Sequence, residues 1–308
     1  PHSGEYVPQH WETRKWISGF TGSAGTAVVT LHEAGLWTDS RYFLQAAEQL
    51  EDTGIALFKD RLPETPSIVD WLGTVLHEDE NVGIDGWVNS FQEADELQKN
   101  LEKKHLHLVL APDPFKELWT DRPALPRDEV FIHEQQYAGL GCKNKIAQIQ
   151  EATTGNGCTG ILISALDEVA WTLNLRGSDV HCNPVFVSYL LITNEGSTLF
   201  IIEDKLSAEA KNYLIENGIT IKPYQQIEED LRAYNGKLRL SPNVNAAIYA
   251  AAQGNAKVEI LPSPVLLLKA VKNKTEIEGF HHAMERDGVA MVKFLRWLKA
   301  AVPAGNET

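Results

Sequence analysis

The sequence predicts an α/β protein in which one structural unit occurs twice in tandem and is followed by the first helix of a third domain. Three observations carry this prediction. A corner containing tryptophan and glycine occurs at two places 155 residues apart. In both halves, strand-like and helix-like hydrophobic spacings alternate, which is typical of α/β domains. After residue 265, this alternation gives way to one long helical pattern.

The two corners are the runs Trp-Ile-Ser-Gly-Phe-Thr-Gly-Ser at 16–23 and Trp-Thr-Leu-Asn-Leu-Arg-Gly-Ser at 171–178. Further along each half, a strand pattern (81–85 or 236–241) precedes a helix pattern, a second strand pattern and a Pro-x-Pro segment. The order and the punctuation are shared although the identity is low. We therefore interpret the halves as two copies of one unit with mixed sheets.

The first copy, residues 1–125, centres on the run Leu-Trp-Thr-Asp-Ser-Arg-Tyr-Phe at 36–43. It follows the glycines Gly19, Gly22 and Gly25, whose spacing is not the dinucleotide fingerprint and which lead into a strand, so we expect a tight corner there. After the Thr-Asp-Ser turn, apolar residues at helical spacing predict that a strand gives way to a helix around Arg41. The other expected elements are strands at 26–30, 54–58, 81–85 and 106–110, a helix starting behind Pro66-Ser67, and a helix at 91–104.

A linker at residues 119–127 separates the copies, because Pro123 and Pro126 support neither a helix nor a sheet ladder. The second copy, residues 126–265, begins with a helix and a strand that have no counterpart before Trp16. A sheet without one of its strands exposes a long edge, so we expect a few dozen further residues to precede Pro1. The elements expected in the second copy are a helix at 143–153, strands at 160–164, 184–193 and 197–202, a helix, strand and helix through Leu231, then a strand, helix and strand ending near residue 261.

Residues 266–308 differ in character from the two copies. Residues 272–298 form one long amphipathic pattern with apolar side chains near helical spacing. A single helix cannot bury such a stripe by itself. We therefore expect this segment to be the first element of a third domain whose remainder follows Thr308.

Composition excludes several classes of function. The chain has 28 basic and 42 acidic residues, a formal charge of −14, which argues against nucleic acid as a partner. No apolar run approaches the roughly 20 residues that a membrane span needs. Cys142, Cys158 and Cys182 are an odd number at spacings that fit neither a disulfide framework nor a zinc site, so we expect a reducing, cytoplasmic location.

Arg41 is the candidate site residue, because polar side chains at strand-to-helix turns often face a ligand in α/β proteins. The alternative is that Arg41 pairs with Asp39 or another nearby carboxylate and only closes the turn. No metal motif such as HExxH occurs, and adjacent histidines such as His281 and His282 lie about 100° apart on a helix, so they are expected on its surface.

Several long runs resemble those of the three-domain Xaa-Pro aminopeptidases, a group of the M24 peptidase family. They cover essentially the whole chain and are highly specific. The similar runs are Ser-Gly-Glu-Tyr-Val-Pro at 3–8, Ser-Gly-Phe-Thr-Gly-Ser-Ala-Gly-Thr-Ala at 18–27, Leu-Trp-Thr-Asp-Ser-Arg-Tyr-Phe-Leu-Gln-Ala-Ala at 36–47, Trp-Thr-Asp-Arg-Pro at 119–123, the stretch 166–180 with Asn-Pro-Val-Phe at 183–186, and Lys-Ala-Val-Lys-Asn at 269–273.

The resemblance implies two creatinase-N-like α/β domains before a pita-bread catalytic domain that binds two divalent metal ions, usually manganese. It implies a cytoplasmic, homodimeric enzyme that removes the first residue from peptides whose second residue is proline. The family's metal ligands belong to the catalytic domain, so no catalytic residue and no metal ligand carries over to this chain. Arg41 matches the arginine that contacts the peptide substrate in the family, whereas Arg176 is expected to be structural.

A second hypothesis remains open. The two copies could form a metal-free binding or dimerisation module of a relative that has lost its catalytic ligands. The sequence that follows residue 308 would distinguish this module from the enzyme.

Overall fold

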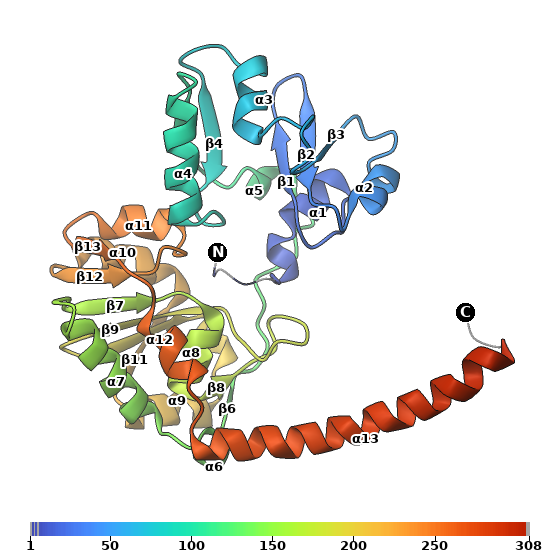
Figure 1. The fold of residues 1–308 in the computed structure, drawn as a ribbon. Helices are drawn as coiled ribbons and strands as arrows, with labels where there is room; N and C mark the ends of the chain where they lie inside the picture. Colours follow the sequence, from blue (N-terminus) through green and yellow to red (C-terminus); the bar gives the residue numbers. More distant parts are fainter. Residues whose placement is uncertain (1, 3, 5, 306–308) are drawn as a thin grey trace.

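The computed structural model describes residues 2, 4 and 6–305, so Ser3 and Glu5 of the 3–8 run lie outside the described residues. The α/β fold with two tandem units is confirmed (Figure 1). We call the segment from Gln9 to Leu118 unit I and the segment from Phe131 to Ala270 unit II. A last helix, α13 (Lys274–Ala304), follows unit II and projects from it.

Unit I contains two separate small sheets. One has three strands, with β1 antiparallel to β2 and β2 parallel to β3, and the other is a parallel pair of β4 and β5. The expected strand at 54–58 begins two residues later, because Gly54 has a positive φ of 77° and ends a turn. The strands of unit I are β1 (Thr26–Val29), β2 (Ala34–Thr38), β3 (Ala56–Lys59), β4 (Asn81–Asp85) and β5 (His107–Ala111).

Local signals define the helices of unit I. The Ser67 side chain accepts a hydrogen bond from Asp70 N and so starts α3. Ser90 and Glu93 form a capping box at the start of α4. The expected helix at 91–104 ends at Glu102. The helical elements of unit I are η1 (Gln9–Trp11), α1 (Thr13–Ser18), α2 (Phe43–Gln49), α3 (Ile68–Val75), α4 (Phe91–Glu102) and α5 (Phe115–Leu118).

Unit II is built on one six-stranded mixed sheet in the order β11-β10-β9-β7-β12-β13. Strand β9 begins at Ser188 instead of 184, because Val187 N donates to the Asp179 carboxylate (2.5 Å) and not to a neighbouring strand. A short antiparallel pair, β6 with β8, lies outside this sheet. The strands are β6 (Phe131–Ile132), β7 (Gly160–Ile163), β8 (Leu175–Arg176), β9 (Ser188–Thr193), β10 (Ser197–Ile201), β11 (Ile219–Pro223), β12 (Lys237–Leu240) and β13 (Lys257–Ile260).

The helices of unit II surround a single large core. Tyr189, Phe186 and Phe200 are among its fully buried side chains. The helical elements are α6 (Gln135–Ala138), α7 (Cys142–Thr154), α8 (Leu166–Leu173), η2 (Glu203–Lys205), α9 (Ala208–Glu216), η3 (Tyr224–Gln226), α10 (Ile227–Ala233), α11 (Ala246–Ala252) and α12 (Pro264–Ala270).

The two units share one topology apart from one strand. The antiparallel hairpin β1–β2 with its parallel neighbour β3 corresponds to β9–β10 with β11, and the parallel pair β4–β5 corresponds to β12–β13. In unit II, β7 pairs with both β9 and β12 and joins the two halves. Among the described residues, unit I has no strand at that place, and its sheet is therefore split in two.

The units contact each other through corresponding elements. Phe91 N, at the start of α4, donates to Val244 O (2.6 Å), and Ala246 N, at the start of α11, donates to Asn89 O (2.9 Å). The rings of Phe91 and Tyr249 lie 3.9 Å apart between centroids. This reciprocal exchange makes a pseudo-twofold contact between the two helix starts.

Helix α13 is capped by Asn273, which forms a capping box with Glu276. The helix passes the expected end at residue 298 and includes Pro303 in its last turn before Gly305, whose φ is 66°. None of its described side chains is buried. Among the described residues, no helix combines the length and apolar character that crossing a bilayer requires. The exposed large apolar side chains of α13 are Ile277, Phe280, Met284, Val289, Met291, Val292, Phe294, Leu295, Trp297 and Val302.

Candidate functional site

Arg41 lies in the turn between β2 and α2, as predicted. Strand β2 ends at Thr38, and Asp39 then accepts a hydrogen bond from Arg41 N at its Oδ1 atom (3.0 Å). Tyr42 N donates to Asp39 O (3.0 Å), which closes the turn one residue before α2 begins. The turn therefore holds Arg41 at the carboxyl end of β2, where α/β folds commonly place ligand contacts.

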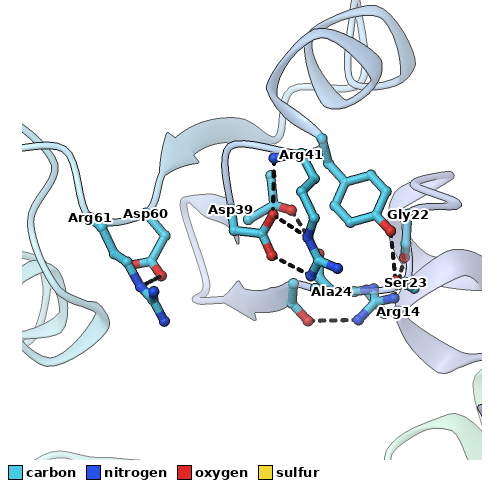
Figure 2. Close-up of polar contacts among 11 residues, drawn as sticks. Arg14, Gly22, Ser23, Ala24, Asp39, Arg41, Asp60 and Arg61 are labelled. Carbon is cyan, nitrogen blue, oxygen red and sulfur yellow. Dashed lines mark hydrogen bonds and ion pairs between the residues drawn. The ribbon is translucent and has the colours of Figure 1, made fainter. Parts of the chain in front are cut away.

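The Arg41 side chain also pairs with Asp39, as the alternative interpretation predicted. Arg41 Nε donates to Asp39 Oδ1 (3.0 Å) and Nη2 donates to Oδ2 (2.7 Å), a bidentate pair shown in Figure 2. This pairing uses two of the five N–H groups of a guanidinium. The Arg41 side chain remains 64% exposed. The ion pair therefore orients the guanidinium without removing it from the surface.

Electrostatics at the turn follow from this pair. Hydrogen bonds from the Arg41 side chain are the largest cause that lowers the pKa of Asp39, from 3.8 to about 2, and the charge of Arg61 adds to the effect. Asp39 is therefore ionised at any pH near neutrality. The guanidinium of Arg41 also lies over the ring of Tyr42, 5.2 Å from the ring centroid. Both contacts favour one orientation of Arg41.

The glycine-rich segment before β1 lies next to the turn that carries Arg41. Gly19 ends α1 with a φ of 71°, and a Cβ on Gly22 would lie 2.2 Å from the Phe20 ring, so the expected tight corner is confirmed. The half-buried Arg14 guanidinium donates to Gly25 O (2.8 Å) and to Gly22 O. Figure 2 shows Arg14 together with the Asp39–Arg41 pair. Arg14 thus fixes the loop that packs next to the turn.

A second Asp–Arg pair, which the sequence analysis missed, follows the neighbouring strand. Asp60 and Arg61 come directly after β3, and Arg61 Nε lies 3.7 Å from Asp60 Oδ2. Because β2 and β3 are parallel, their carboxyl ends meet at one edge of the sheet. The signal in the sequence was the same as for Arg41, an acidic and a basic residue directly after a strand.

A cavity of about 640 Å³ adjoins these strand ends. Its walls come from the segment before β1, the ends of β2 and β3, the start of α3 and the end of α4. Asp39, Asp60 and Asp70 supply carboxylates, and Asp70 pairs with Lys104 (2.8 Å). The residues that line the cavity are Ala24, Gly25, Thr26, Trp37, Thr38, Asp39, Asp60, Arg61, Ser67, Ile68, Val69, Asp70, Asn100, Lys103 and Lys104.

The corresponding edge of unit II has a different character. After β10, the cation Lys205 is fully buried and its ammonium contacts the buried Asp179. After β11, the chain continues with Tyr224 and Gln225 and not with a basic residue. The cation at this edge is therefore buried in unit II, whereas the two arginines at the edge of unit I are exposed.

The other residues weighed from the sequence lie outside this site. Arg176 donates from Nη1 to Ala170 O (3.0 Å) and Leu175 O (2.9 Å), contacts that tie β8 to α8. His281 and His282 lie on the exposed surface of α13, as expected. Neither group lies in the Arg41 turn or lines the cavity beside it.

Potential metal-ligating side chains are scattered over the described part of the chain. Nowhere in it do three or more His, Cys, Asp or Glu side chains come together in a way that could hold a metal ion. Cys142, Cys158 and Cys182 are unbridged. The described residues therefore do not form a metal centre.

Comparison with protein families gives two matches. Both family models are described as the Creatinase/Prolidase N-terminal domain. One matches residues 6–118 and the other matches residues 121–276, about half of the chain. The matched ranges together contain both units and the start of α13.

Individual relatives match nearly the whole of this chain, but the matched region is only about half of each relative. It is 37% identical to Xaa-Pro aminopeptidase 1 of Dictyostelium discoideum over 98% of this chain and 49% of that protein. It is 36% identical to aminopeptidase P2 of Arabidopsis thaliana over 98% and 47%. The chain therefore spans about half the length of these curated relatives.

A solved structure has the same fold. It is an X-prolyl aminopeptidase from Caenorhabditis elegans, described as a cytosolic enzyme with a di-nuclear active site. The two chains superpose with a TM-score of 0.91 and are 32% identical. The match covers 99% of this chain and 51% of that one.

Proposed function

The chain belongs to the Creatinase/Prolidase N-terminal domain family, and on that premise we propose that it is the amino-terminal portion of an Xaa-Pro aminopeptidase. In this proposal, the whole protein hydrolyses the X–Pro bond at the N-terminus of peptides. The observation that carries the proposal is the superposition on the X-prolyl aminopeptidase of Caenorhabditis elegans over 99% of this chain. The similarity to named aminopeptidases along the whole chain supports it.

The chemistry explains why such an enzyme is specialised. An X–Pro bond has no amide N–H, and the proline ring restricts the residue before it. An enzyme for this bond cannot use a hydrogen bond from that N–H, which leaves the carbonyl and carboxylate oxygens of the peptide as polar groups that it can recognise. The exposed guanidinium of Arg41, oriented by Asp39, is suited to that task because its planar N–H groups match such acceptors. We propose that Arg41 contacts the peptide substrate.

Two divalent metal ions belong to this proposal, and manganese is the proposed identity. The di-nuclear active site named for the Caenorhabditis elegans relative supports the number of ions. When bound, such ions would supply Lewis acidity and the activation of water for hydrolysis. The described residues contain no group that could hold a metal, so the proposal assigns the ligands to a part of the protein outside this chain.

The proposal also includes a homodimer and a cytosolic location. The apolar side chains exposed along α13 support further contacts, either with the rest of the protein or with a second copy. The description of the Caenorhabditis elegans relative as cytosolic supports the location. Light scattering of the full-length protein would give the oligomeric state.

The test is release of the first residue from Arg-Pro-Pro by the full-length protein loaded with manganese. We expect cleavage after the first arginine and loss of activity after treatment with a chelator. Arg-Ala-Ala, which has no X–Pro bond, is the matched control and is expected to remain intact. A folded, metal-loaded protein that leaves Arg-Pro-Pro intact would support a metal-free binding or dimerisation module instead.

A further inference from the structure

Arg61 has an unusual backbone conformation. Its φ is 65°, in the left-handed region that non-glycine residues rarely adopt. Glycine or asparagine would fit this position with less strain. Strained backbone of this kind is enriched at functional sites. Asp52, Asp79, His105, Asn174 and Cys182 also have a positive φ, so a reason for arginine at this position has to come from the contacts of its side chain.

The local ion pair does not supply that reason. The Arg61 side chain is 89% exposed, and its Nε atom lies 3.7 Å from Asp60, whose side chain is 50% exposed. An exposed pair at this distance contributes little to folding stability. Among the described contacts, nothing that Arg61 makes offsets the strain of its backbone.

The position of Arg61 relative to Arg41 supplies a better reason. Asp60 N donates to Thr38 O (2.9 Å), which ties the turn after β3 to the end of β2. Arg61 is also close enough to Asp39 for its charge to contribute to the lowered pKa of that carboxyl. Figure 2 shows the two Asp–Arg pairs in one view, each in the turn that follows its strand.

The cavity beside these residues is lined by Arg61, Lys103 and Lys104 together with three carboxylates. Each carboxylate that lines it is already paired with a cation: Asp39 with Arg41, Asp60 with Arg61, and Asp70 with Lys104. In unit II, the corresponding strand ends keep their cation fully buried against Asp179. The exposure of two guanidiniums is thus particular to unit I and is not required by the shared topology.

We propose that Arg61 is a specificity-determining residue that binds a carboxylate of the peptide substrate on the carboxyl side of the proline, next to Arg41. The planar fork of a guanidinium binds carboxylates in a bidentate manner. In a tripeptide, this carboxylate is the C-terminal group. The inference rests on the proposed function, because it names the part of the substrate that Arg61 recognises.

The experiment compares Arg-Pro-Pro with its C-terminal amide in steady-state assays of the metal-loaded, full-length protein. We expect Arg61→Gln to raise KM for the free acid by about three- to tenfold, with kcat nearly unchanged, and to leave KM for the amide unaltered. Arg61→Lys keeps the charge and is expected to retain most of the affinity. Arg-Pro-Glu-amide carries a side-chain carboxylate but no terminal one. If Arg61→Gln raises KM for this amide as well, Arg61 binds a side-chain carboxylate; if it does not, Arg61 binds the terminal carboxylate.

A second variant separates recognition from folding. Arg61→Gly removes both the guanidinium and the backbone strain, so we expect a higher Tm together with the same rise in KM for the free acid. Equal effects of Arg61→Gln on the acid and the amide, or no effect on either, would overturn the role of Arg61 while the aminopeptidase stands. A wild-type protein that cleaves neither peptide would overturn the proposed function and this inference with it.

Discussion

Two neighbouring side chains, Asp39 and Arg41, combine the two roles that the sequence left open. The bidentate ion pair is present, but the Arg41 side chain is still 64% exposed. An ion pair whose members both face solvent adds little stability. Its effect here is to orient the guanidinium at the end of β2, which is compatible with a contact to substrate.

Replacing Arg41 by alanine tests that contact. We expect Arg41→Ala in the full-length protein to lower kcat/KM for Arg-Pro-Pro by roughly 1–3 kcal/mol of transition-state stabilisation, because a charged hydrogen bond is lost. Arg41→Lys keeps the charge but not the planar fork of N–H groups. We expect its kcat/KM to lie between those of the wild type and Arg41→Ala. Unchanged kinetics with a lower Tm would restore a structural role for Arg41.

The ionisation of Asp39 gives a test that does not depend on activity. Its pKa in the folded chain is about 2, below the ordinary value of 3.8, so the stability contributed by the pair is complete above pH 4 and is lost as the pH falls toward 2. Carboxyl-carbon NMR should show that Arg41→Gln moves this pKa back toward 3.8. Arg61→Gln should move it less, since Arg61 is the weaker cause. A pKa that does not respond to Arg41→Gln would contradict the ion pair in solution.

Among the secondary-structure elements, the start of α13 is tied to unit II by specific hydrogen bonds. Asn273 Nδ2 donates to Ala138 O (2.8 Å), and its Oδ1 atom accepts from Glu276 N (3.0 Å). Trp171 Nε1 donates to Glu276 Oε1 (3.3 Å). A single asparagine thus caps the helix and anchors it, so the direction in which α13 leaves unit II is set at its first turn.

We expect Asn273→Ala to lower the free energy of unfolding by about 1–2 kcal/mol, because the N-cap and the tie to Ala138 are both lost. Asn273→Ser is the matched control, since serine keeps the cap acceptor but is too short to replace the amide donor. It should lie between wild type and alanine in urea unfolding followed by circular dichroism. Equal stability of all three proteins would show that the cap does not hold α13.

Across the whole molecule, the two units differ in how their sheets and cores are built, although they share a topology. Unit II has one extended core around a continuous sheet, whereas the core of unit I consists of two small clusters. Among the described residues, β1 and β4 each pair on one side only. Within the described residues, unit I therefore has open strand edges and a divided core.

We therefore expect faster amide hydrogen exchange in β1 and β4 of the 308-residue chain than in β7, β9 and β12. Strands with an open edge and few buried neighbours open locally at lower free energy than strands in the middle of a sheet. Exchange measured by mass spectrometry on peptides from each strand checks this order. Uniform protection across both units would contradict it.

Much of the fold could be predicted from the sequence because its signals are local. The order of strands and helices, the repeat and the linker follow from hydrophobic spacing, capping residues and prolines that act over a few positions. The predicted start of a strand was wrong where a contact from outside these few positions determined it. Strand β9 starts at Ser188 because Asp179, nine residues earlier along the chain, binds the backbone of Val187.

The candidate site shows the same division. The turn that carries Arg41 was predictable, since a strand, a polar turn and a helix follow one another within twelve residues. The pairing of Arg41 with Asp39 was one of two alternatives that the sequence left open, and the neighbouring Arg61 could not be assigned in that way. Arg61 reaches the site only because β3 pairs in parallel with β2, a contact between segments separated by a helix and a turn.

By itself, the sequence determined that this protein has two α/β units with the same order of elements, followed by one long helix, and that its net charge is acidic. Net charge follows from composition, and the order of elements follows from hydrophobic spacing between residues that are near each other in the chain. The missing counterpart of β7 in unit I was also visible in the sequence, whereas only the tertiary structure decided that β7 lies between β9 and β12 in the sheet of unit II. It also decided that two Asp–Arg pairs share one edge of the three-stranded sheet of unit I beside a cavity. These features depend on pairing between distant segments, which local spacing does not encode.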